Sequence, residues 1–219
     1  MLYQIPANSN EKICTKYVTT KCFKDEEIKK IIESLKPGAW RDAGVYQNPE
    51  AGTINKSHRK CEIQLLEKLL QQVDIEECEI KLLSYEVEDF PLPQITHQIS
   101  NINNNFWNFD IRYIPMREDS PAVFKYPIGG KFNWHMDITP AAATRKLSYS
   151  IQLSDTNDYE GGDLEFFDGD NTGKKEKNPQ LRQKGNIIVF PSYLWHRITP
   201  ITKGIRYAIV GWIHGPTYR

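Results

Sequence analysis

The chain has 219 residues, of which 39% are hydrophobic, which is enough for one well-filled core but short for two independent domains. Lysine plus arginine balance aspartate plus glutamate at 28 each, so net charge gives no attraction to nucleic acid or to an anionic membrane. No basic segment leads into an apolar one at the start of the sequence, and no stretch nears the roughly 20 apolar residues that span a bilayer. We therefore expect a soluble, cytoplasmic protein with one domain over residues 1–219.

The first part of the chain contains a clear amphipathic pattern. Segment 23–38, FKDEEIKKIIESLKPG, places Ile28, Ile31, Ile32 and Leu35 at helical spacing, with acidic residues first and Pro37-Gly38 last. This predicts a helix. Residues 41–60 are polar and rich in Gly, Pro and Asn, which indicates a surface loop that is either a lid or a connection.

Between Gln64 and Asn105, leucines and isoleucines recur every three or four residues, with interruptions at Pro91 and Pro93. The pattern predicts two further helical segments. We therefore expect residues 1–106 to be helices and loops that support the rest of the domain. The four cysteines form no C-x-x-C pair, which favours free thiols over a zinc site; they are Cys14, Cys22, Cys61 and Cys78.

From about residue 107 onward the chain is built of short runs rich in β-branched and aromatic residues, which are typical of strands. The runs are FDIRYI, AVFKY, KLSYSIQLS, DLEFF, NIIVF and RYAIVGWIH. Turn-like segments separate them, and most of these segments have no helical pattern. Such a series favours an antiparallel sandwich or jelly roll over a parallel α/β sheet. The expected class is α+β with a mainly β core and the N-terminal helices packed outside.

Two histidines and one aspartate stand where strands are predicted. In FNWHMDIT, His135 and Asp137 are two residues apart, so in an extended chain their side chains share a face. This pair alone is little better than a chance match. Further on, His196 opens a short strand, Pro200 to Gly204 predicts a turn, and Arg206 begins a long apolar strand, so a hairpin is expected.

Arg206 is the residue that links this possible metal site to a bound anion. Alternation places it on one strand face with Ala208, Val210 and Trp212, and a buried arginine requires an anionic partner. No acidic residue is an obvious partner in the sequence, which favours a bound carboxylate. Two histidines and one carboxylate suit Fe(II) with open coordination positions, and a guanidinium can bind the distal carboxylate of 2-oxoglutarate through two parallel hydrogen bonds.

Together these residues resemble the 2-oxoglutarate/Fe(II)-dependent dioxygenases of the prolyl 4-hydroxylase type. The resemblance covers residues 122–214 and rests on Tyr126, the His135-x-Asp137 pair, the YEGG-x-L segment at 159–164, and His196 with Arg206 ten residues later. It implies a double-stranded β-helix, which is a distorted jelly roll, over about residues 107–219. It also implies Fe(II), 2-oxoglutarate and O₂ as cofactor and co-substrates.

The resemblance assigns roles to seven residues. His135, Asp137 and His196 are expected as iron ligands and as the catalytic centre, and Arg206 as the 2-oxoglutarate anchor. Tyr126 is expected to donate a phenol hydrogen bond to the co-substrate, with a half-buried strand tyrosine as the alternative. Gln152 is placed near the distal carboxylate, or else is a polar core residue. Trp212 either contacts the substrate or belongs to the core.

The implied reaction is hydroxylation, because halide-transferring relatives lack the carboxylate that Asp137 supplies. A prolyl residue in a peptide or protein is the leading substrate, and a free amino acid or another small molecule is the alternative. Two other classes stay open: a jelly-roll ligand-binding protein, and a cupin oxygenase without 2-oxoglutarate. The segment Asp168–Gly173 begins like a calcium loop, but Pro179 stands where a glutamate ligand is required, so a hairpin turn is expected.

Overall fold

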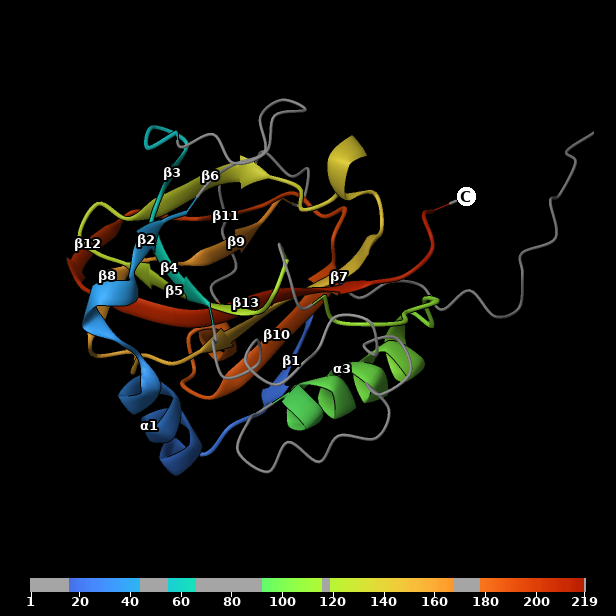
Figure 1. Cartoon of the computed structure of the whole chain (residues 1–219), viewed down its shortest axis with the longest axis horizontal. Coiled ribbons are helices and arrows are strands. Elements are labelled where there is room, and N and C mark those ends of the chain that lie inside the picture. Colours follow the sequence, from blue (N-terminus) through green and yellow to red (C-terminus); the bar gives the residue numbers. More distant parts are fainter. Residues whose placement is uncertain (1–15, 44–54, 66–91, 116–118, 168–177, 219) are drawn as a thin grey trace, which may run out of the picture.

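A computed structural model describes residues 16–43, 55–65, 92–115, 119–167 and 178–218. It contains two α-helices and a series of antiparallel strands (Figure 1). The helices are α1 (Asp25–Ser34) and α3 (Leu92–Phe106), and short 3-10 turns lie at Pro37–Ala39, Pro140–Ala142 and Pro179–Leu181. No helix in this described part of the chain has the length and apolar character needed to cross a bilayer.

The strands form a large sheet, a smaller sheet and one separate pair. The large sheet has the order β1-β10-β7-β13-β5-β4-β2, the smaller one β3-β6-β11-β9, and the pair is β12-β8. The strands are β1 (Val18–Lys21), β2 (Arg41–Asp42), β3 (Arg59–Lys60), β4 (Glu62–Leu65), β5 (Ala122–Tyr126), β6 (Lys131–His135), β7 (Arg145–Gln152), β8 (Tyr159–Gly161), β9 (Leu164–Phe166), β10 (Asn186–Pro191), β11 (His196–Ile198), β12 (Ile201–Gly204) and β13 (Arg206–His214).

From β5 onward the chain passes back and forth between the two larger sheets. Strands β5, β7, β10 and β13 lie in the large sheet, whereas β6, β9 and β11 lie in the smaller one. This alternation is the expected double-stranded β-helix, a distorted jelly roll with antiparallel pairing throughout. It places the smaller sheet across one face of the large sheet, as Figure 1 shows.

The two helices cover the other face of the large sheet (Figure 1). One core cluster joins Ile28 and Ile31 of α1, and Ile95 and Ile99 of α3, to sheet residues such as Ile209. A second cluster fills the space between the sheets and includes Phe124, Ile188, Phe190 and Ile198. The large sheet is therefore buried on both faces. This explains why every residue of β7 and β10 is buried, instead of buried and exposed residues alternating along the strand.

Helix α1 confirms the helix predicted within residues 23–38. Its first turn carries Asp25, Glu26 and Glu27, and the Glu27 carboxylate accepts a hydrogen bond of 2.7 Å from the Lys24 backbone N–H. Acidic residues in the first turn complement the positive end of the helix dipole. The helix ends at Ser34, before the Pro37-Gly38 pair.

The second helical segment expected before Asn105 is confirmed by α3, which has Pro93 in its first turn, where a missing N–H costs nothing. Two other expectations about the elements were wrong. Gln64 and Leu65 were expected at the start of a helical segment, yet they belong to β4, which pairs with β5 and is held by an ion pair of 2.6 Å between Lys125 and Glu62. Residues 109–114 are not a strand; only an isolated bridge joins Tyr113 to His214.

The predicted hairpin of His196 and Arg206 was also wrong. Strand β11 pairs with β6 and β9 in the smaller sheet, whereas β13 pairs with β5 and β7 in the large sheet. The segment between them forms β12, which pairs with β8, so residues 201–204 are a strand where a turn was expected. The connection crosses from one sheet to the other, which is the jelly-roll path.

The loop expected at residues 41–60 pairs at both ends, through β2 and β3, and its middle, 44–54, lies outside the described residues. The turn expected at Asp168–Gly173 and part of the helical segment after Gln64 also lie outside them. Of the four cysteines, Cys22 and Cys61 are buried free thiols as expected, and Cys14 and Cys78 are not in the described range.

Ile209 tests the core between helices and sheet. It is 0% exposed at the centre of β13, so Ile209→Ala is expected to lower the free energy of unfolding by about 2 to 5 kcal/mol through lost burial and a cavity. Urea denaturation followed by circular dichroism measures this. Ile128→Ala is the matched control, because Ile128 is 63% exposed and its loss should stay within about 0.5 kcal/mol. Equal losses in the two variants would contradict the assigned core.

Candidate metal and co-substrate site

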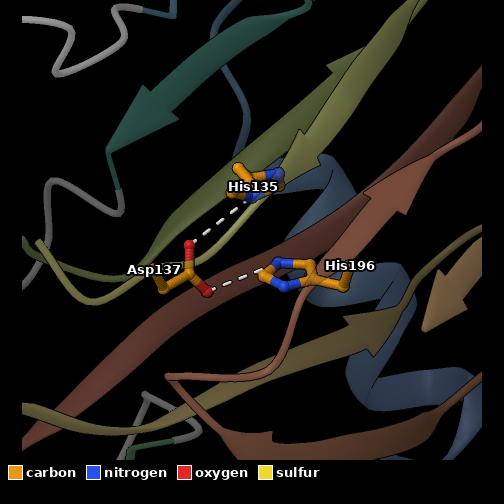
Figure 2. A group of neighbouring side chains, drawn as sticks. All are labelled: His135, Asp137 and His196. Carbon is orange, nitrogen blue, oxygen red and sulfur yellow. Dashed lines mark ion pairs between the residues drawn. The ribbon is translucent and has the colours of Figure 1, made fainter. Parts of the chain in front are cut away.

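His135, Asp137 and His196 converge between the two sheets. His135 ends β6 and His196 begins β11, and these two residues are directly paired across the smaller sheet. Asp137 lies two residues past the end of β6. Its Oδ1 is 3.5 Å from His135 Nε2 and its Oδ2 is 3.5 Å from His196 Nε2, so one carboxylate oxygen faces each imidazole (Figure 2).

The ligand atoms of these three residues all lie within 4.8 Å of one another. Within the described part of the chain they are the only group of three or more His, Cys, Asp or Glu side chains that could share an ion. Two ligands that hold one ion at about 2.1 Å each lie roughly 3 to 3.5 Å apart, and each imidazole is at the upper end of this range from one oxygen of Asp137. The three side chains are therefore close enough to share a divalent metal after a small contraction.

Both imidazoles are oriented by their backbone. His135 Nδ1 is 2.7 Å from the carbonyl oxygen of Asn133, and His196 Nδ1 is 2.9 Å from that of Leu194. Because a carbonyl oxygen only accepts, each Nδ1 carries the proton and each Nε2 keeps a free lone pair directed at the site. Each histidine is therefore fixed as the tautomer that a metal ligand requires.

The protonation states also suit a metal. Burial and, to a lesser extent, the nearby His135 lower the pKa of His196 to about 4, although Asp137 acts against them, so this imidazole is neutral near pH 7. Burial alone would raise the pKa of Asp137, but His196, His135 and Arg145 outweigh it and hold that pKa well below its usual range. Two imidazoles and one carboxylate are the donor set of the facial triad of non-haem iron enzymes.

Arg206 lies in the same pocket as the three residues. It is only 1% exposed, and its Nε and Nη2 donate to Gln152 Oε1 at 3.2 and 3.0 Å. Its Nη1 is buried and has no hydrogen-bond partner among the described residues. A neutral amide therefore orients the guanidinium without neutralising it, and an unpaired buried N–H remains for an anion, as a co-substrate carboxylate requires.

The other three predicted residues lie around this pocket or its arginine. Tyr126 is directly opposite Arg206 in the β5–β13 pairing, and its ring centroid is 5.3 Å from the Arg206 guanidinium carbon. Burial is the largest cause that raises the pKa of Tyr126, and the adjacent Cys61, with which the phenol hydrogen-bonds, raises it further. Trp212 lines the pocket, whereas Gln152 reaches it through Arg206.

Sequence reasoning missed several polar residues of the pocket. Arg59 of β3 lines it, and its guanidinium carbon lies 4.4 Å from the centre of the Phe132 ring. Ser148 and Arg145 of β7 contact Asp137 directly. Arg59, Arg145 and Ser148 stand at none of the motif positions that pointed to the metal and the co-substrate, so only the fold could identify these residues.

The other three histidines had no partners at ligand spacing in the sequence, where they were interpreted as surface or hydrogen-bonded residues, and none of them joins the triad. His214 lies 2.9 Å from Thr144 and 3.3 Å from Asp119, and His97 lies 3.0 Å from Asn101. His58 packs edge-on against Phe132. They are hydrogen-bonded or packed residues, as expected.

Comparison with known proteins agrees with this geometry. Residues 121–214 match the family model described as the 2OG-Fe(II) oxygenase superfamily, where 2OG is 2-oxoglutarate. This part of the chain is similar to the 2OG-Fe(II) oxygenases, and it contains His135, Asp137, His196 and Arg206. That superfamily implies Fe(II), 2-oxoglutarate and O₂.

A curated relative is a PKHD-type hydroxylase of Idiomarina loihiensis, 35% identical over 103 residues that cover 45% of each chain. The chain thus spans about half the length of the curated relatives it matches. Among solved structures, a prolyl-4-hydroxylase of Pseudomonas putida is 18% identical, with a TM-score of 0.60 over 91% of this chain and 92% of the other.

A prolyl hydroxylase of Trichoplax adhaerens, solved with a peptide fragment of hypoxia inducible factor, is 19% identical, with a TM-score of 0.63 over 91% of this chain and 84% of the other. These likenesses show that the chain has the fold of those two proteins.

Asp119 binds Arg145, which in turn contacts Asp137, and it provides a test by pH. Burial favours its neutral form, but His214 and Arg145 outweigh this and lower its pKa from 3.8 to about 2. A depressed carboxyl pKa stabilises the fold above about pH 4, and this stability is lost as the pH falls toward 2. Asp119→Asn should therefore cost about 2 kcal/mol at pH 7 and progressively less between pH 4 and 2.

Urea unfolding of both proteins at pH 7, 4 and 3 measures this difference. Asp110→Asn is the control, because Asp110 is an exposed carboxylate paired only with exposed Arg112 among the contacts described. A difference for Asp119→Asn that is independent of pH would contradict the assigned ion pair.

Proposed function

We propose that the chain is a 2-oxoglutarate- and Fe(II)-dependent hydroxylase. In this proposal His135, Asp137 and His196 hold the iron and Arg206 anchors 2-oxoglutarate. The observation that carries the proposal is the placement of the Arg206 guanidinium, with one unpaired buried N–H, in the same pocket as two histidines and a carboxylate that fit a metal. A metal-binding or sugar-binding jelly roll would have no use for this arginine.

The protein residues bind and orient the reactants. The bound Fe(II), 2-oxoglutarate and O₂ supply the oxidation, which releases succinate and CO₂ and transfers one oxygen atom to a C–H bond of the substrate. Arg206 pairs with the distal carboxylate of 2-oxoglutarate, and Gln152 fixes the direction of its guanidinium. The pocket walls, including Phe190 and Ile198, exclude water from the reacting atoms.

Tyr126 and Trp212 have supporting roles in this proposal. Tyr126 is next to Arg206 and can donate its phenol hydrogen bond to the co-substrate. Trp212 lines the pocket, and its indole Nε1 is buried without a hydrogen-bond partner among the described residues. We assign Trp212 to substrate contact on that basis, because a buried indole N–H usually has a partner.

We further infer that the substrate is a prolyl residue in a peptide or protein. The support is the prolyl hydroxylase fold of the solved relatives, one of which was solved with a peptide. A free amino acid or another small molecule is the second candidate. In either case we propose one catalytic domain over residues 1–219, in which the N-terminal part supports the 107–219 core; the packing of α1 and α3 on the large sheet supports this.

Formation of succinate from 2-oxoglutarate, with Fe(II) and O₂ supplied, tests the function. The unaltered chain should form succinate, even without substrate, at a slow uncoupled rate. Arg206→Ala should raise the KM for 2-oxoglutarate at least about 30-fold, equivalent to the ~2 kcal/mol lost when one partner of a buried charge pair is removed. Arg112→Ala is the control, because Arg112 is exposed and distant from the pocket.

No turnover by the unaltered chain, together with no binding of 2-oxoglutarate to its metal form, would overturn the proposed function. Unchanged 2-oxoglutarate affinity in Arg206→Ala would overturn only the anchor role.

Gly162 provides a second test of the anchor. Its φ of +64° is in the left-handed region, and an added Cβ would overlap the Ile201 side chain and lie 3.1 Å from Cδ of Arg206. Gly162→Ala should therefore displace Arg206 and raise the KM for 2-oxoglutarate on the order of ten-fold, equivalent to about 1.4 kcal/mol. Gly38→Ala should have no effect, because nothing lies within 4 Å of its Cβ position. The same KM in both variants would contradict the assigned packing.

A further inference from the structure

Asp137 is held by more than the two histidines. Its Oδ2 accepts a hydrogen bond of 2.6 Å from the Ser148 hydroxyl. The Ser148 oxygen is in turn 2.9 Å from the Ser192 hydroxyl oxygen. Because the Ser148 proton is used on Asp137, Ser192 is the donor in this second bond. Two hydroxyls thus form a chain that ends on one carboxylate oxygen.

The backbone of Asp137 is fixed on both sides as well. Its N–H donates to the Ser192 carbonyl oxygen at 3.0 Å, and its own carbonyl oxygen accepts from Arg145 Nη1 at 3.1 Å. Ser148 and Arg145 belong to β7, and Ser192 directly follows β10. The residue after β6 of the smaller sheet is therefore attached to two adjacent strands of the large sheet.

Arg145 is itself held rigidly. Its Nε and Nη2 both donate to the Asp119 carboxylate, with Nε at 2.9 Å, and its guanidinium carbon lies 3.9 Å from the centre of the Trp212 ring. His214 Nε2 is 3.3 Å from the same carboxylate. Arg145 is 5% exposed, Ser148 1% and Ser192 0%, so water does not compete for these bonds.

The hydroxyl bond makes the two oxygens of Asp137 unequal. Oδ2 is engaged by Ser148, whereas no hydrogen-bond donor other than His135 faces Oδ1 among the contacts described. A carboxylate held in this way is prepared to bind a metal through one oxygen. Binding through one oxygen leaves more coordination positions for a chelating co-substrate and O₂ than binding through both.

We propose that Asp119, Arg145, Ser148 and Ser192 form a clamp that positions Asp137 for the metal and directs Oδ1 toward it. The inference deepens the proposed function and rests on it. None of the four residues of the clamp is assigned as a ligand; each acts through Asp137. Its consequence is that metal affinity depends on a serine that never touches the metal.

The test is the affinity for Mn(II), followed by the loss of the electron paramagnetic resonance signal of the free ion. Ser148→Ala should weaken Mn(II) binding by about ten-fold, the lower end of the effect of losing a bond that orients a metal ligand. Ser154→Ala is the matched control: Ser154 is a buried serine just beyond β7 whose hydroxyl bonds only backbone groups, Ile205 O and Tyr207 N, among the described contacts. It should bind Mn(II) as the unaltered chain does.

A second pair of variants tests the arginine. Arg145→Lys keeps the charge but loses the branched guanidinium group that bonds both the Asp119 carboxylate and the Asp137 carbonyl oxygen. It should therefore also weaken Mn(II) binding by about ten-fold. Arg182→Lys is its control, because Arg182 likewise joins an aspartate, Asp163, to backbone carbonyls but does not contact Asp137. Melting temperatures of all four variants separate general loosening of the fold from loss at the metal.

Mn(II) affinity that is unchanged in Ser148→Ala and Arg145→Lys, or that falls equally in their controls, would overturn the clamp and leave the proposed function intact. Failure of the unaltered chain to bind Mn(II) would instead overturn the proposed function, and the clamp with it.

Discussion

The structure depends on one constraint: a carboxylate and a guanidinium are buried in the same pocket between the two sheets. Asp137 is 7% exposed and Arg206 is 1% exposed, and both line one pocket. A buried charge that lacks compensation destabilises a fold by several kcal/mol. Hydrogen bonds from Ser148 and attraction to the histidines compensate Asp137, while Gln152 only partly satisfies Arg206. The pocket therefore favours one negative group near the arginine and one cation near the carboxylate.

The jelly-roll path makes this arrangement possible. The histidines come from the smaller sheet, whereas Arg206, Tyr126 and Gln152 come from three adjacent strands of the large sheet. A cation site on one sheet thus faces an anion site on the other. No residue of α1 or α3 lines the pocket: the helices bury the outer face of the large sheet, opposite the site.

Rigidity is the second property that the site requires. Both imidazoles are tied to carbonyl groups two residues earlier in their own chain, which is a local interaction. Asp137 instead depends on bonds to residues far away in sequence, such as Ser192 and Arg145. A carboxylate just past a strand end has no local partner to fix it, so the large sheet must do so. Because these bonds hold the carboxylate in place before the metal binds, less conformational entropy is lost on binding.

The sequence by itself determined the mainly β class and the helix within residues 23–38, and it predicted a functional group of His135, Asp137, His196 and Arg206, which the structure brings into one pocket. It could do so because strand alternation and the charge of a single arginine are local facts. It did not determine that β11 and β13 lie in different sheets, since a short turn-like segment fits a hairpin as well as a crossing. Only the tertiary structure decided which polar residues hold Asp137, because Ser148, Ser192 and Arg145 meet it through pairing between distant strands, and distant pairing has no signature in one sequence.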